Sequence, residues 1–284
     1  MTALGDLTLT RIGLGCMPLS LGRGRERGLA GETIAAALDA GVNLLDTADA
    51  YALDEAEFGH NERLVAAGLA AYAGPGHAVV ATKGGHTRHG YEWALDGSPE
   101  YLRRACEGSL RRLGVEAIEL YQLHRPDPDT PYAESVGALR DLRDEGKIRH
   151  VGLSNANLAQ LEEAERIVPI AAIQNELSPR YIEPLVGGEV DACAARGIPF
   201  LAWSPLGGID AAAEASGGVA AIRAIAADRG VSPQRVTLAW LLSLSEAIVP
   251  IPGASRPETI RDSAAALDLE LDEAERERIG AELA

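Results

Sequence analysis

Short apolar runs alternate with longer helical patterns along the whole chain, and this alternation limits the possible folds. Several of the runs show little polar alternation, which is typical of strands that are covered on both faces. Strands that alternate with helices indicate parallel βαβ units. Eight such runs can be counted: Ile12–Met17, Val42–Ala48, Ala78–Lys83, Ala117–His124, Ile148–Ser154, Pro169–Gln174, Ile198–Ser204 and Ala247–Pro252.

The length of the chain decides how these units are arranged. At 284 residues, a closed α/β barrel routinely forms one domain. We therefore expect residues 1–284 to form a single (β/α)8 TIM barrel rather than an open sheet. The leading segment Ala3–Thr10 is expected to form a short hairpin on the barrel floor. Two extra C-terminal helices are expected, over Glu258–Leu267 and Asp272–Leu283.

Local signals mark helices and loops between the strands. Ser98 followed by Pro99 predicts an N-cap and a first helical turn. A helix is also expected over Pro184–Arg196. Two segments are expected to be loops, namely Gly22–Gly31, which is rich in Gly and Arg, and Thr87–Gly97, which is polar with two aromatic residues.

Composition indicates which kinds of partner the chain can bind and in which cellular compartment it is expected. The chain has 26 Lys and Arg against 42 Asp and Glu, a net charge of −16, which argues against nucleic acid as a partner. Three widely spaced cysteines without a CxxC motif favour a reduced, cytoplasmic setting. The sequence contains no apolar run of about 18 residues and no apolar N-terminal signal core, so no membrane association is expected.

Four polar residues lie at or just beyond three neighbouring strand ends, where a barrel of this kind has its active site. A tyrosine such as Tyr51 has a reference pKa of about 10, and the ammonium of Lys83 would stabilise its anion. Asp46 can supply the counter-charge of that lysine, and His124 can orient a carbonyl oxygen. Each residue alone is more often structural, but together they could stabilise an alkoxide that forms when hydride reaches carbon.

These residues and their spacing resemble the catalytic tetrad of the aldo-keto reductases. The resemblance implies that Tyr51 is the general acid, Lys83 the group that lowers its pKa, Asp46 the anchor of Lys83, and His124 the group that orients the carbonyl. It implies an oxidoreductase that reduces an aldehyde or ketone to an alcohol with NADPH. The matching blocks are Asp46-Thr47-Ala48-x-x-Tyr51, Ala81-Thr82-Lys83, Leu120–His124, Gly146–Asn155, Gln174-Asn175, Trp203–Leu206 and Ile251–Ala254.

The same resemblance implies a set of cofactor-binding residues. Ser154, Asn155 and Gln174 would hydrogen-bond the nicotinamide carboxamide. Trp203 would stack on the nicotinamide ring, where the family usually has Tyr. The positions implied for the pyrophosphate and the adenosine end are Ser204, Leu206, Gly207, Gly253, Ser255 and Arg256.

The resemblance favours NADPH, although the phosphate-binding loop departs from the family pattern. Gly253-Ala254 stands where many members have Lys-Ser, and Asp262-Ser263 stands where they have Glu-Asn. Arg256 and Arg261 would be the cations for a 2′-phosphate, and NADH stays compatible with the sequence. No GxGxxG fingerprint is found, as expected for a family that binds dinucleotides without a Rossmann fold.

Other residues bear on the substrate and on alternative functions. Met17 and Trp93 are expected to line the substrate pocket. His86-x-x-His89 has no further ligand at metal-binding spacing, so no metal is expected. The motifs Asp49-Ala50-Tyr51 and Thr82-Lys83-Gly84-Gly85 resemble those of pyridoxal-reductase-like members of the family. The substrate, the physiological direction and the oligomeric state stay open.

Two further functions are compatible with a barrel of this kind. The first is a non-catalytic, cofactor-binding subunit of the same fold, which would bind the nicotinamide cofactor and serve a partner protein. The second is a lyase or isomerase that uses Lys83 as a Schiff-base amine. A non-catalytic subunit would show no turnover, which distinguishes it from a reductase. A Schiff-base lyase or isomerase would not bind the nicotinamide cofactor, which distinguishes it from both.

Overall fold

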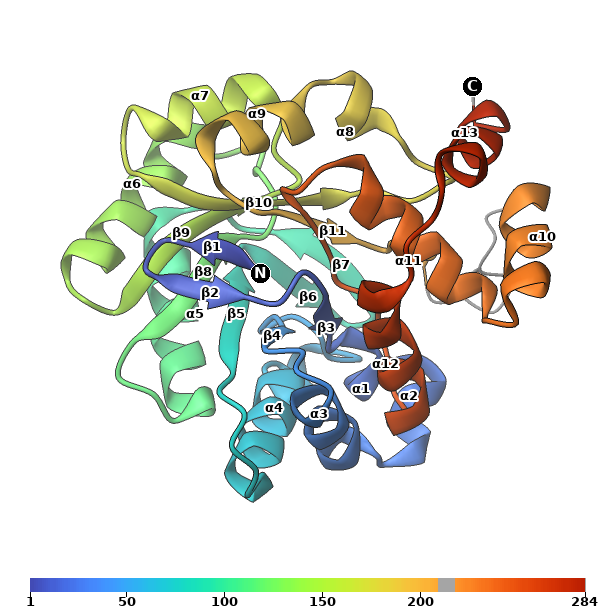
Figure 1. The fold of residues 1–284 in the computed structure, drawn as a ribbon. Coiled ribbons are helices and arrows are strands. Elements are labelled where there is room, and N and C mark those ends of the chain that lie inside the picture. The colour runs from blue at the N-terminus through green and yellow to red at the C-terminus, as the bar shows by residue number, and fades with distance from the viewer. Residues whose placement is uncertain (209–217, 284) are drawn as a thin grey trace.

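The computed structural model describes residues 1–208 and 218–283. Within those residues, eight parallel strands form one sheet in which neighbours follow chain order (Figure 1). Each strand coincides with one of the eight predicted apolar runs, and the bounds differ by a few residues. The strands are β3 (Gly13–Gly15), β4 (Leu44–Asp46), β5 (Val79–Gly84), β8 (Ile118–Leu123), β9 (Ile148–Ser154), β10 (Ile170–Glu176), β11 (Phe200–Trp203) and β12 (Ile248–Pro250).

The two edges of this sheet, β3 and β12, meet and close the barrel. Gly15 forms a parallel bridge with Gly253, and its amide donates a hydrogen bond to the Pro252 carbonyl at 3.0 Å. This close approach requires glycine. A Cβ on Gly15 would lie 2.8 Å from the Ile251 carbonyl oxygen, and one on Gly253 would lie 2.7 Å from Pro18 Cγ. The predicted (β/α)8 barrel is confirmed.

Helices surround the barrel, and their ends follow local signals. The Ser98 hydroxyl accepts a hydrogen bond from the Tyr101 amide, with Pro99 as the first helical residue. The helices are α1 (Met17–Ser20), α2 (Gly22–Arg27), α3 (Ala30–Asp39), α4 (His60–Ala71), α5 (Pro99–Leu113), α6 (Tyr132–Asp144), α7 (Leu158–Glu165), α8 (Glu183–Val186), α9 (Glu189–Arg196), α10 (Ala220–Arg229), α11 (Pro233–Leu244), α12 (Pro257–Ala264) and α13 (Glu273–Ala281). Short 3-10 helices cover Glu55–Glu57 and Ala265–Asp268.

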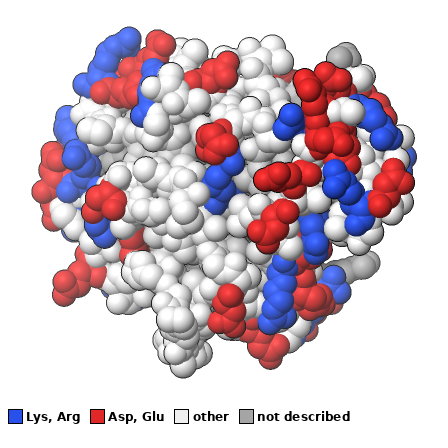
Figure 2. Space-filling view, viewed as in Figure 1, with Lys and Arg blue, Asp and Glu red and all other residues white. Residues whose placement is uncertain are grey.

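The expected N-terminal hairpin forms and lies across one end of the barrel (Figure 1). Strands β1 (Thr2–Leu4) and β2 (Leu7–Leu9) pair antiparallel. Leu4 and Leu9 are fully buried in one cluster with Leu44 and Leu120 from the barrel strands. Apolar packing therefore seals this floor, and the strands carry their C-terminal ends to the opposite face. Figure 2 views the floor side, where acidic and basic side chains are interspersed toward the rim.

Both segments expected to be loops contain regular structure. Within Gly22–Gly31, α2 runs to Arg27 and ends at Gly28 with a left-handed φ of 65°. Within Thr87–Gly97, β6 (His86–His89) and β7 (Glu92–Leu95) form an antiparallel hairpin. Neither segment has apolar periodicity, so its structure comes from backbone hydrogen bonds and glycine turns rather than from an apolar face.

Two predicted helices are also shorter than expected. The helix expected over Pro184–Arg196 is divided into α8 and α9 at Gly187-Gly188, where Gly188 has a φ of 88°. The helix expected over Glu258–Leu267 changes to a 3-10 turn from Ala265. The predicted last helix is observed as α13.

Candidate active site

The structure brings Asp46, Tyr51 and Lys83 into direct contact at the mouth of the barrel. Lys83 Nζ donates hydrogen bonds to Asp46 Oδ2 at 2.7 Å and to the Tyr51 hydroxyl at 3.1 Å. A third goes to the Thr47 carbonyl at 2.8 Å, so all three ammonium protons have partners. Lys83 is fully buried, and Asp46 is 3% exposed. The ammonium is thus fixed between a carboxylate and a phenol.

His124 completes this group from the end of β8. Its ring lies edge-on to the Tyr51 ring, with centroids 5.6 Å apart. Burial lowers the pKa of His124 well below its usual value, and the nearby Lys83 charge adds to the effect. The imidazole is therefore neutral near pH 7, as a group that hydrogen-bonds a carbonyl without transferring charge should be.

The pKa of Tyr51 differs from the sequence expectation. Burial raises this pKa above its ordinary value, and the opposing effect of the Lys83 ammonium is smaller. Burial lowers the pKa of Lys83, but Asp46 and Tyr51 raise it, and the net direction is upward. The phenol is therefore protonated and the amine charged near neutral pH. A protonated phenol is the form that can donate a proton.

A buried polar network positions the loop that carries Tyr51. Asn61, from α4, donates hydrogen bonds to the Cys16 carbonyl at 2.8 Å and to the Ser20 hydroxyl at 2.6 Å. It accepts one from the Thr47 hydroxyl at 2.6 Å. Ser20 in turn donates to the Tyr51 carbonyl at 2.8 Å. The sequence analysis missed Asn61 and Ser20, because helix residues far along the chain give no sign of a shared contact.

Gln174 lies closer to the four residues than expected. Its side-chain nitrogen donates to Asp46 Oδ1 at 2.7 Å, while Gln122, which the sequence analysis did not single out, lies 3.5 Å from the same oxygen. One oxygen of Asp46 thus contacts Lys83 and the other contacts the two amides. Gln174 therefore holds Asp46, a contact that the sequence analysis did not predict.

Two of the expected cofactor residues have left-handed backbones. Asn155, just after β9, has a φ of 57°, and Ser204, just after β11, has a φ of 48°. They are the non-glycine residues with positive φ in the part of the chain that the structure describes. Such conformations cost energy and cluster at ligand sites. Asn155 also donates hydrogen bonds to the Ser154 hydroxyl and to the His124 carbonyl, both at 3.0 Å.

Trp203, at the end of β11, adjoins this pair. Its Nε1–H is buried and has no hydrogen-bond partner within the described residues. Beyond it the chain turns through a bond from the Gly207 amide to the Ser204 carbonyl at 2.8 Å, with Leu206 almost fully buried. Gly207 has a left-handed φ of 84°. A buried N–H without a partner is the kind of group that a ligand can satisfy.

The residues expected at the adenosine end lie near an additional cation. Arg27, from α2, donates from Nη1 to the Ser255 hydroxyl at 3.3 Å. Arg256 lies 3.3 Å from Glu258, and both are exposed. Gly253, which is also expected at the adenosine end, pairs with Gly15 of β3 and thereby closes the barrel. Contact between α2 and the loop after β12 could not be read from the sequence.

The β6–β7 hairpin covers one side of the group. His86 lies 4.3 Å from His124 and 5.3 Å from Trp93, measured between ring centroids. The guanidinium of Arg88 lies 3.3 Å from the centroid of the Trp93 ring. The structure therefore brings Trp93 near the four residues through His86. Met17, the other expected pocket residue, is half-buried at the start of α1, directly after the first barrel strand.

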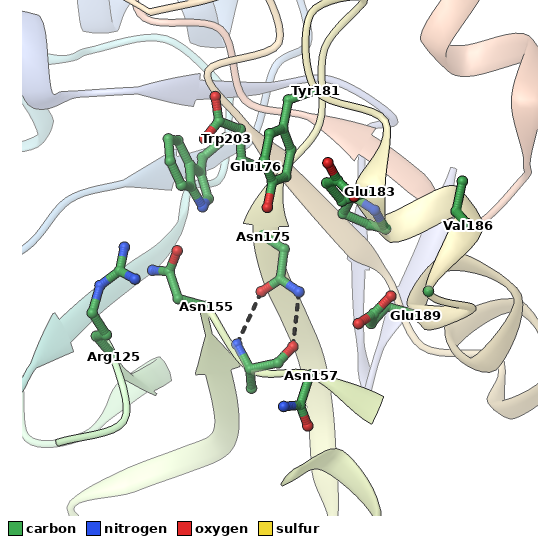
Figure 3. Close-up of a pocket in the computed structure, with 13 residues that line it drawn as sticks. Arg125, Asn155, Asn157, Asn175, Glu176, Tyr181, Glu183, Val186, Glu189 and Trp203 are labelled. Atoms are coloured by element: carbon green, nitrogen blue, oxygen red, sulfur yellow. Dashed lines mark hydrogen bonds between the residues drawn. The ribbon is translucent and has the colours of Figure 1, made fainter. Parts of the chain in front are cut away.

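A pocket of about 480 Å³ opens next to Trp203 and Asn155 (Figure 3). In Figure 3, Arg125 and Asn155 lie on the side of the Trp203 ring, and Glu183 and Glu189 lie toward the other end. Its lining combines polar and apolar surface and consists of Arg125, Asn155, Ala156, Asn157, Asn175, Glu176, Tyr181, Glu183, Pro184, Val186, Gly187, Glu189 and Trp203.

No group of three or more His, Cys, Asp or Glu in residues 1–208 and 218–283 could hold a metal ion. Among the helices that the structure describes, none is both long and apolar enough to cross a membrane.

Comparison with known proteins identifies the family. The model of the aldo/keto reductase family matches residues 11–282. The 6-dehydroglucose reductase of Novosphingobium aromaticivorans is 38% identical over 252 residues, covering 86% of this chain and 82% of the relative. The aldo-keto reductase yakc of Schizosaccharomyces pombe, whose name specifies NADP(+), is 30% identical over 303 residues, covering 95% and 87%.

Solved structures agree with this match. The glycerol dehydrogenase of Gluconobacter oxydans superposes with a TM-score of 0.83 at 28% identity, over 100% of this chain and 94% of that one. An aldo/keto reductase of Klebsiella pneumoniae in complex with NADP and acetate gives 0.80 at 25% identity, over 97% and 92%. With its barrel and its cluster of Asp, Tyr, Lys and His, the chain belongs to the aldo/keto reductase family of oxidoreductases.

Proposed function

We propose that the protein reduces an aldehyde or a ketone to an alcohol with NADPH, with Tyr51 as the general acid. The observation that carries this proposal is the hydrogen bond between Lys83 Nζ and the Tyr51 hydroxyl, 3.1 Å long, in a site where both side chains are buried. A buried phenol beside a fixed ammonium can give up its proton during reduction, because the ammonium stabilises the phenolate that is left.

Each residue of the group has a separate task. His124, which is neutral, donates a hydrogen bond to the carbonyl oxygen and orients it beside Tyr51. Tyr51 then transfers its proton to that oxygen as negative charge develops there. Lys83 stabilises the phenolate, and Asp46 keeps the ammonium in place with the help of Gln174. The nicotinamide cofactor, when bound, supplies the hydride that the carbonyl carbon receives.

The residues at strand ends β9 to β12 fit a nicotinamide dinucleotide. The buried Nε1–H of Trp203 lacks a partner, and Asn155 and Ser204 have the left-handed backbones expected of a ligand site. Ser154, Asn155 and Gln174 would hold the nicotinamide carboxamide, and Trp203 would stack on its ring.

The preference for NADPH rests on cations near the adenosine end. Arg27 contacts Ser255, and Arg256 follows in the same loop. In a chain with a net charge of −16, such local cations favour binding of a 2′-phosphate. The proteins named for or solved with NADP among the relatives support the same choice.

Two alternatives lead to different results. A Schiff-base mechanism needs a neutral Lys83, whereas its ammonium donates three hydrogen bonds and its pKa is raised. A non-catalytic, cofactor-binding subunit would bind NADPH without turnover. The same geometry serves either a subunit or an enzyme, so turnover decides between them.

The test is a panel of aldehydes and ketones, including pyridoxal for the predicted subgroup, with NADPH or NADH oxidation as the readout. We expect turnover with NADPH and a loss of most turnover in Tyr51→Phe. Tyr72→Phe is the matched control, because the Tyr72 hydroxyl contacts Asp39 at an exposed position. Equal turnover in the Tyr51 and Tyr72 variants would refute the proposed role of Tyr51.

A further inference from the structure

A histidine on the β6–β7 hairpin lies beside the proposed catalytic residues. The His86 ring meets the His124 ring edge-on, with centroids 4.3 Å apart and planes at 86°. It also contacts the Trp93 ring at 5.3 Å and 72°. Arg88 lies over the Trp93 ring and donates to the Tyr91 carbonyl at 2.9 Å. These contacts hold His86 next to the group that is proposed to bind the carbonyl oxygen.

Hydrogen bonding fixes which nitrogen of His86 carries the proton. Nδ1 lies 3.2 Å from the Ala94 carbonyl oxygen, and a carbonyl oxygen can only accept. Nδ1 is therefore the protonated nitrogen, and Nε2 of the neutral ring is an acceptor. Burial lowers the pKa of His86 to about 4, so the ring is neutral near pH 7.

The Nε2 atom is open to a ligand. It makes no hydrogen bond within the described residues, and it is not one of the buried polar atoms that lack a partner. Because the neighbouring His124 is proposed to hold the carbonyl oxygen, a substituent on the carbon next to that carbonyl comes within reach of His86. An acceptor at this place suits a substituent that donates a hydrogen bond.

The pocket that Arg125 lines contains polar side chains as well as apolar surface. Pockets for small molecules are usually lined mainly by apolar and aromatic side chains. Here the lining includes the side chains of Asn155, Glu176 and Tyr181 (Figure 3). Arg125 lies between this pocket and the pair of His86 and His124. It lines the pocket, it directly follows His124 in the chain, and its charge contributes to the low pKa of His86.

We propose that His86 is a specificity-determining residue whose Nε2 accepts a hydrogen bond from a hydroxyl group on the carbon next to the substrate carbonyl. The enzyme then prefers α-hydroxy aldehydes and α-hydroxy ketones over analogues that lack the hydroxyl. An analogue without the hydroxyl leaves the acceptor without a partner once the site is closed to water. This inference rests on the proposed carbonyl reduction and names its substrate class.

The test uses two pairs of probes of nearly equal size: hydroxyacetone with butanone, and glycolaldehyde with propionaldehyde. For each pair, the readout is the ratio of the two kcat/KM values with NADPH. In the wild type we expect a ratio of about ten in favour of the hydroxylated member. His86→Phe keeps a ring against His124 and Trp93 but removes both nitrogens, so the ratio should fall about tenfold. His86→Gln, whose amide oxygen can accept, should regain part of it.

The control is His89→Phe, the same substitution on the same hairpin at an exposed residue. It should keep the wild-type ratio. An unchanged ratio in His86→Phe would overturn the inference even if both rates fell, because a displaced hairpin slows both probes alike. A wild-type ratio near one would overturn it as well and leave the proposed reduction standing. No turnover of any carbonyl would instead overturn the proposed function itself.

Discussion

Replacing Lys83 by Met tests the charge on which the proposed chemistry depends. Methionine is close to lysine in length, so the substitution removes the ammonium with little change in volume. In the folded protein this ammonium lies 3.1 Å from the Tyr51 hydroxyl and 2.7 Å from Asp46. Its loss therefore affects both the phenolate that forms in the reaction and the carboxylate that is already present.

The two effects have different magnitudes. At 3.1 Å and an effective dielectric constant of about 20, an ammonium stabilises a phenolate by about 5 kcal/mol. This corresponds to a loss of about 10³–10⁴-fold in kcat/KM. Removing one partner of a buried ion pair costs about 3–5 kcal/mol of folding free energy, because the other charge is left uncompensated.

Stopped-flow NADPH oxidation measures the first effect, and urea unfolding measures the second. The double variant Asp46→Asn with Lys83→Met should regain part of the lost stability, since no buried charge is left unpaired, while activity stays low. Lys147→Met is the matched control, because Lys147 pairs with Glu107 and Glu145 at a partly exposed site and should cost about 1 kcal/mol or less. Activity within tenfold of wild type in Lys83→Met would show that the ammonium does not stabilise a phenolate in the reaction.

Asn61, the cations near Ser255 and the two buried histidines each have an effect that can be measured. Asn61→Ala removes three buried hydrogen bonds and should lower the free energy of unfolding by about 2–3 kcal/mol, with a lower kcat; an unchanged urea midpoint would contradict this. Arg27→Ala and Arg256→Ala should each raise KM for NADPH about tenfold and leave KM for NADH unchanged, which steady-state kinetics with both cofactors can check. Burial lowers the folded-state pKa of His86 to about 4 and also lowers that of His124. Below about pH 6.5 the unfolded state therefore binds more protons than the folded state, so stability should fall as the pH falls from there toward 4. A series of Tm measurements against pH tests this, and the slope should be shallower in His86→Phe.

The strands could be predicted because burial on both faces leaves a direct mark on the sequence. Runs such as Val42–Ala48 contain few polar residues until the strand ends, where Asp46 begins the polar group. The β6–β7 hairpin could not be predicted in the same way. Its sequence from His86 to Leu95 is polar, and its structure depends on antiparallel pairing and on Gly90, which has a left-handed φ of 59°.

The site was predicted in part, for a related reason. Asp46, Tyr51, Lys83 and His124 stand at strand ends, and parallel strands bring their ends together whatever lies between them. The bond between Gln174 and Asp46 joins residues 128 positions apart, and the contact of Arg27 with Ser255 joins residues 228 apart. Such contacts depend on the tilt of strands and helices, which a single sequence does not specify.

In the proposed reaction Tyr51 transfers a proton to the carbonyl oxygen. The most direct test is a single-turnover measurement, in which the enzyme with bound NADPH is mixed with a reactive aldehyde and NADPH oxidation is followed. For Tyr51→Phe we predict a wild-type Kd for NADPH and a rate constant lower by about 10²–10⁴-fold. A rate constant within tenfold of the wild type, with NADPH still bound, would show that Tyr51 is not the general acid.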